Sequence, residues 1–144
     1  MEELLELRGY IEQRHYTKAL DLVGEMEEMS RSDKVNKIRS FMEILLIHLI
    51  KQAAEKRSTR SWELSIKNAL RQIYRINQRR KARGRYVEHE ELQELIKKSY
   101  QPALEYASLE AFGGAYESHQ VSQMIDRMVI EQKGFELIQN YQEE

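Results

Sequence analysis

Apolar side chains recur every three or four positions along most of the chain, the spacing of helices that bury one face. A short first helix carries Leu4, Leu7 and Ile11 and ends near residues 14–15. A second helix is expected over about residues 19–29, with Ala19 and Val23 on its apolar face. The N-terminal third of the chain therefore begins with two amphipathic helices.

A third helix is predicted over residues 33–54. Ser30 or Ser32 can cap it, because a serine hydroxyl accepts a hydrogen bond from the first free backbone N–H groups of a helix. Residues 44–50 are apolar on every face except at His48. A helix that is apolar all round is buried, so we expect this third helix at the centre of the fold.

The rest of the chain contains further helix boundaries. Residues 58–61 cap a fourth helix that begins near Trp62, and a fifth begins near Glu88. Pro102 either kinks the fifth helix or opens a short sixth one, since proline removes a backbone donor. A Gly-Gly pair at 113–114 ends that element, and a last helix covers residues 121–142.

These elements predict an all-α fold, a compact bundle of five to seven helices with a buried central third helix. We expect residues 1–112 to form the bundle domain. Residues 113–144 would then form a hinge and a C-terminal amphipathic helix, packed on the bundle or on a partner.

Composition narrows the class of protein. The 144 residues include one proline and no cysteine, which excludes a disulfide framework and thiolate chemistry. The apolar run at 44–50 is too short to cross a bilayer, so we expect no membrane contact and a cytoplasmic location. The net charge is −1, yet residues 55–85 hold 11 basic and 2 acidic side chains. This basic segment is the main electrostatic feature.

Four short stretches carry a family resemblance: EME at 25–27, RSD at 31–33, LLIHLIK at 45–51 and RSWELSI at 60–66. Over about residues 1–110 the chain resembles the domain-of-unknown-function family number twenty-nine. The resemblance implies a small all-helical bacterial protein of a kind abundant in cyanobacteria. It implies no established activity.

His48 is the first candidate for chemistry, because a buried imidazole costs free energy unless its ring nitrogens find partners. Glu25 or Glu27 on the second helix, or Arg60 at the start of the fourth, could supply them. The favoured interpretation is a hydrogen-bonded core histidine. Acid–base chemistry, with Arg60 steadying an anion, stays open, and His48, Arg60 and Glu25 are the catalytic candidates.

Metal and cofactor sites are not expected. The sequence contains no HExxH, no pair of histidines four residues apart and no phosphate-binding glycine loop. His89 stands among glutamates at the start of the fifth helix, where the macrodipole favours negative charge. Neither a metal ion nor a cofactor is therefore predicted.

The basic segment is the second candidate. Its cations could contact the phosphates of a nucleic acid, pair with an acidic partner, or simply form a solvated face that pairs with the chain's own acidic segments. The last of these is favoured. The candidate residues are Lys67, Arg71, Arg75, Arg79, Arg80, Lys81, Arg83 and Arg85.

The C-terminal stripe is the third candidate, because it is too apolar to be left exposed. It packs either on its own bundle or on a second copy, and a homodimer is slightly favoured. The candidate residues are Val121, Ile125, Met128, Phe135 and Ile138. The leading hypothesis is a non-enzymatic protein-interaction module that binds a protein partner or itself. The alternative is an RNA-directed protein, a small ribonuclease or toxin–antitoxin component, that uses the basic fourth helix.

Overall fold

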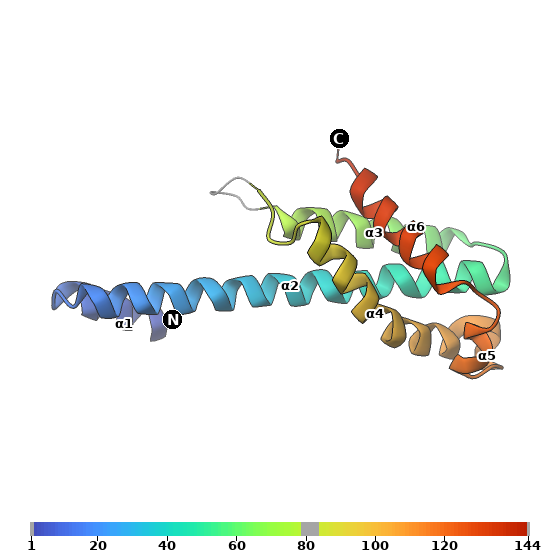
Figure 1. The fold of residues 1–144 in the computed structure, drawn as a ribbon, viewed down its shortest axis with the longest axis horizontal. Coiled ribbons are helices and arrows are strands. Elements are labelled where there is room, and N and C mark those ends of the chain that lie inside the picture. Colours follow the sequence, from blue (N-terminus) through green and yellow to red (C-terminus); the bar gives the residue numbers. More distant parts are fainter. Residues whose placement is uncertain (1, 79–83, 144) are drawn as a thin grey trace. The chain divides into compact units, whose positions relative to one another are not determined.

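The computed structural model describes residues 2–78 and 84–143. Within them the chain is helical, with one isolated bridge between Gln78 and Arg85 and no longer strand. The predicted all-α fold class is confirmed. In chain order the elements are α1 (Glu2–Glu12), α2 (Tyr16–Glu55), α3 (Arg60–Asn77), α4 (His89–Glu110), the 3-10 helix η1 (Ala111–Gly114), α5 (Ser118–Ser122) and α6 (Arg127–Asn140). Figure 1 labels the six α-helices.

The chain divides into two units, Met1–Val35 and Asn36–Glu144. The first unit is a helical hairpin of α1 and the N-terminal part of α2, and the second contains the rest of α2 with α3 to α6. The expected boundary after residue 112 does not coincide with this division. The C-terminal helices lie in the same unit as α3 and α4, and α6 packs against both of them.

The second and third predicted helices are one helix, α2, of 40 residues. The expected break at residues 30–33 is wrong. Ser30, Ser32 and Asp33 are favourable caps only where a helix begins, and inside a helix each costs only a few tenths of a kcal/mol to about 0.7 relative to alanine. No proline or glycine stands there to interrupt the backbone hydrogen bonds, so the helix continues.

The C-terminal half of α2 forms the core of the second unit, as predicted for the central helix. Ile38, Met42, Leu45, Leu46 and Ile50 are completely buried. Within this unit α3, α4 and α6 pack against that half of α2 (Figure 1).

Helix ends in the second unit follow local signals. Thr59 caps α3, because its hydroxyl accepts a hydrogen bond from the Trp62 N–H at 3.1 Å. This confirms the expected cap at 58–61. The predicted last helix is two helices, because Asp126 starts α6 anew by accepting hydrogen bonds from the Met128 and Val129 N–H groups. Pro102 lies inside a continuous α4, so no separate helix begins there.

The chain leaves α4 through η1 in a left-handed conformation. Phe112, Gly113 and Gly114 have φ angles of 53°, 66° and 79°. Glycine adopts such angles freely, whereas a bulky side chain at positive φ is strained. The Phe112 N–H donates to Glu55 Oε2 at 3.3 Å, which ties this turn to the end of α2.

A buried asparagine joins the end of α3 to the start of α4. The Asn77 side chain donates to the Val87 carbonyl at 2.9 Å and accepts from the Val87 N–H at 2.7 Å. Asn77 and Val87 are both buried, so neither Val87 group has water as an alternative partner. The amide thereby replaces a strand partner and holds together the two ends of the connection between α3 and α4.

We expect Asn77→Ala to lower the free energy of unfolding by about 2–4 kcal/mol, because it leaves two buried backbone groups unpaired. Urea unfolding followed by circular dichroism measures the change. Asn68→Ala, at an exposed position of the same helix, is the matched control and should cost far less. Equal losses for the two variants would contradict this role.

Candidate functional site

His48 lies on α2, half-buried, with its Nδ1 atom enclosed and without a hydrogen-bond partner. The expected hydrogen bond from Glu25, Glu27 or Arg60 is therefore wrong among the described residues. Glu25 and Glu27 belong to α2 itself and are exposed, and no separate second helix presents them to His48. Arg60, at the start of α3, is exposed as well.

The group that makes the polar contacts near this part of α2 is Lys51, one turn further on. Its side chain is almost completely buried, and its Nζ donates to Glu110 Oε2 on α4 at 2.9 Å. The same ammonium lies 4.7 Å from the centre of the Trp62 ring on α3. A buried cation needs such partners, since it has lost its water. Lys51 thus joins three helices.

A second cation also contacts Trp62. The Arg57 guanidinium lies 4.8 Å from the ring centre and donates to Glu55 Oε1 at 2.9 Å. Burial alone would raise the pKa of Glu55, but the hydrogen bonds from Arg57 and the Phe112 N–H outweigh it, and the pKa is lowered. Glu55 is therefore a carboxylate that orders the ends of α2 and α4.

Together, His48, Lys51, Glu55, Trp62 and Glu110 form a polar cluster, which we call the α2 cluster. Burial is the largest cause that lowers the pKa of His48, and repulsion from the Lys51 ammonium is the second. The negative charge of Glu110 partly offsets both effects. His48 is consequently a neutral imidazole near pH 7. Lys51 and Glu110 are already paired with each other, and Glu55 is held by Arg57 and the Phe112 N–H, which fits a structural junction better than an acid–base site.

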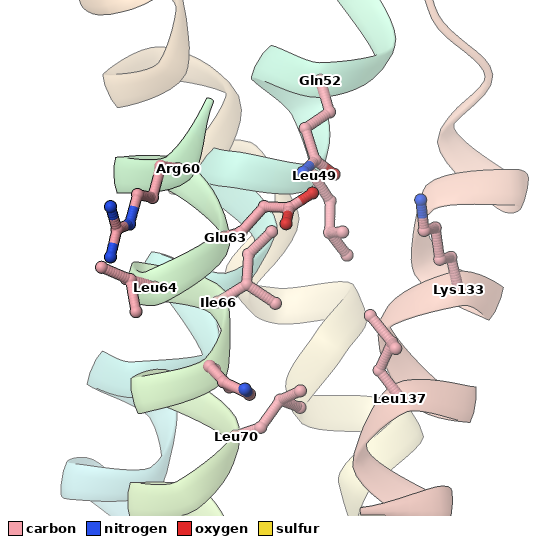
Figure 2. Close-up of a pocket in the computed structure, with 10 residues that line it drawn as sticks. Leu49, Gln52, Arg60, Glu63, Leu64, Ile66, Leu70, Lys133 and Leu137 are labelled. Carbon is pink, nitrogen blue, oxygen red and sulfur yellow. The ribbon is translucent and has the colours of Figure 1, made fainter. Parts of the chain in front are cut away.

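An open groove of about 390 Å³ lies beside the α2 cluster. We call it the α3–α6 groove. Its apolar lining residues are Leu49, Leu64, Ile66, Leu70 and Leu137, and its polar ones are Gln52, Arg60, Glu63, Lys67 and Lys133. Figure 2 shows Ile66 and Leu70 of α3 facing Leu137 of α6 across the groove. Arg60 is thus a groove residue and is not a partner of His48.

We call the candidate cations of the basic segment, from Lys67 to Arg85, the basic ridge, and the structure describes only part of it. Arg79, Arg80, Lys81 and Arg83 lie outside the described residues. Lys67, Arg71, Arg75 and Arg85 are exposed. The Arg75 Nε donates to Glu143 Oε1 at 2.7 Å, and this hydrogen bond and charge raise the pKa of Arg75. At this position the ridge pairs with the acidic C-terminal segment of its own chain.

The predicted self-association stripe is divided between the interior and the surface. Val121 and Phe135 are buried, Ile125 and Ile138 are half-buried, and Met128 is 79% exposed. The break before α6 separates Val121 from the rest, and α5 and α6 pack on α4. A second copy could reach Val121 or Phe135 only by opening this packing.

Sequence reasoning missed one surface, on the N-terminal hairpin. Six large apolar side chains there are more than half exposed, namely Leu4, Leu5, Ile11, Tyr16, Leu20 and Met29. The signal in the sequence that could have revealed this surface was the length of the segment, which holds only two helices. Two helices with no third helix to cover them bury only the stripes that face each other.

With this geometry established, comparison with known proteins identifies the family. The family model described as "Domain of unknown function DUF29" matches residues 11–125. The chain belongs to the DUF29 family. No curated protein and no solved structure matches it.

The DUF29 match begins after most of α1 and extends through α5. The resemblance over residues 1–110 is therefore correct in family, although its limits are shifted towards the C-terminus. The match contains the α2 cluster and the α3 part of the groove, whereas α6 lies beyond it. In the described part of the DUF29 chain, no helix has the length and apolarity that a membrane crossing requires, and no three His, Asp or Glu side chains are grouped to hold a metal ion.

The depressed pKa of His48 makes stability depend on pH. Below its ordinary value of 6.5 the unfolded chain takes up a proton at His48 that the folded protein does not. The free energy of unfolding should therefore fall as the pH is lowered from about 7.5 towards about 5.5. His48→Leu should lose less stability than the wild type over this window.

Urea unfolding at a series of pH values measures this difference. His119→Gln, at an exposed position, is the control and should keep the wild-type dependence. If His48→Leu shows the same loss at low pH as the wild type, His48 does not contribute to it.

Proposed function

We propose that this DUF29 protein is a non-enzymatic protein-interaction module whose docking surface is the hairpin Met1–Val35. The observation that carries the proposal is the exposure of large apolar side chains there. Leu5 and Leu20 are 69% and 72% exposed. The buried hydrophobic residues described in this unit are Ala19 and Leu22.

In a hairpin of two helices, each helix covers only the side chains of the other that face it, so apolar side chains on the remaining faces stay exposed. A helix in a globular core buries a stripe at least about 100° wide, which usually requires more than one neighbour. Grouped apolar side chains left in water are typical of surfaces that bind another protein. A helical partner that covers the hairpin would supply the missing contact.

The α2 cluster supports a binding role over catalysis. Lys51 and Glu110 are paired with each other, Glu55 is held by Arg57, and the enclosed Nδ1 of His48 has no hydrogen-bond partner. Catalytic acid–base groups need access to a substrate proton. We therefore assign the cluster to the stability of the second unit. The absence of cysteine suits a reducing compartment, and we place the module in the bacterial cytoplasm.

The hairpin proposal predicts that the double variant Leu5→Lys, Leu20→Lys loses partner binding by at least about tenfold, because desolvated apolar side chains dominate binding energy. Both positions are exposed, so the helices should persist, which circular dichroism checks. Affinity capture from the native host, quantified by mass spectrometry, and light scattering of the purified protein give the readouts.

Leu109→Lys is the matched control, since Leu109 is equally exposed but lies on α4 in the second unit. It should capture the same proteins and self-associate as the wild type does. Unchanged capture and unchanged self-association in the hairpin double variant would overturn the proposal.

RNA binding is the competing function, and the same protein tests it. Because Arg75 is paired with Glu143, the ridge has less free charge for phosphates. We expect no retention of total RNA on the wild type even at about 50 mM salt. Retention that falls steeply with salt and is abolished by Arg71→Glu would instead favour the RNA-directed function.

A further inference from the structure

The α3–α6 groove has a composition that selects its occupant. Five aliphatic side chains line it, and Leu64 at its edge is 58% exposed. Its volume of about 390 Å³ falls in the range of roughly 300–1,000 Å³ typical of ligand clefts. The open apolar lining between two helices suits a third helix laid along it with aliphatic anchors.

The charges around the groove add a second requirement. Arg60, Lys67 and Lys133 contribute three positive charges and Glu63 one negative charge. In Figure 2 Lys133 stands on the α6 side and Glu63 on the α3 side. A helix with a surplus of acidic side chains next to its apolar anchors would meet complementary potential there.

The helix α1 has this chemistry. α1 carries four glutamates and one arginine between Glu2 and Glu12. Its Leu4, Leu5 and Ile11 are all more than half exposed. Leu4 and Ile11 are seven residues apart, two turns on nearly the same face, which separates them by about 10 Å along the axis.

We infer that the α3–α6 groove of one copy of this protein receives α1 of a second copy. The inference rests on the proposed function, because it uses the exposed surface of the hairpin and names its partner. Leu4 and Ile11 enter the aliphatic lining, and the glutamates of α1 face the lysines of the groove, while Arg8 stays bonded to Glu12 within its own helix. A reciprocal exchange closes a dimer, and a one-way contact continues into longer chains.

A charge exchange tests the contact. Glu6→Lys places a cation on α1, and Lys133→Glu places an anion on the groove. Each variant alone should self-associate at least about tenfold more weakly than the wild type, because like charges then face each other. Mixing the two variants should restore association, since the altered α1 of one meets the altered groove of the other.

Analytical ultracentrifugation gives the association constants. It is carried out on each full-length variant and on the one-to-one mixture, in which one component is fluorescently labelled. Val129→Lys, exposed on α6 outside the groove, is the control and should associate as the wild type does. Recovery in the mixture supports the inference whether dimers or longer chains form. A wild type that stays monomeric at high micromolar concentration overturns it, as does a mixture no stronger than its components.

The two proposals fail in different ways. If Leu5→Lys, Leu20→Lys abolishes capture of other proteins while the wild type is monomeric, the hairpin is a docking surface and the groove is not its receptor. Self-association that survives Lys133→Glu and Leu64→Lys but is lost in the hairpin double variant leads to the same conclusion. If self-association is lost in both the hairpin variant and the groove variants, and is recovered when Glu6→Lys and Lys133→Glu are mixed, the result supports both the hairpin and the groove as contact surfaces.

Discussion

Burial of the C-terminal half of α2 is the constraint on which the second unit depends. Five of its side chains, Ile38, Met42, Leu45, Leu46 and Ile50, are completely buried, and contacts with α3, α4 and α6 surround the helix except near Ile44, which is 38% exposed. α6 lies close to α2 at Gly134, where an added methyl group would be in ordinary van der Waals contact with Leu46 and Leu49. The polar junction around Lys51 lies near the C-terminal end of α2, where it links α2 to α3 and α4.

Much of this arrangement could be predicted from periodicity. The all-round apolar stretch around His48 correctly indicated the central helix, and residues 58–61 correctly indicated the start of α3. The predicted break near Ser32 and the predicted continuous last helix were wrong for one reason. A capping residue marks a position where a helix can begin or end, but long-range packing determines whether the helix is interrupted there. The helix continues through Ser32, whereas a new helix begins after Asp126.

The candidate sites were less predictable, because they depend on contacts between distant residues. Lys51 was overlooked in favour of His48, since no local pattern shows that a lysine will be covered by Trp62 and paired with Glu110. The groove likewise joins residues of α2, α3 and α6 that no sequence spacing connects. Exposed apolar residues on the hairpin follow only from knowing that α1 and α2 have no third helix between residues 1 and 35 to cover them.

Trp62 is the single tryptophan of the chain, and it is buried with two cations over its ring. Indole emission responds strongly to nearby charge and to water, so the protein carries an intrinsic optical reporter of the junction between α2 and α3. The hairpin contains no tryptophan. Unfolding of the hairpin alone would consequently leave the tryptophan fluorescence unchanged while lowering the helical ellipticity. Comparison of the two signals therefore separates the two units.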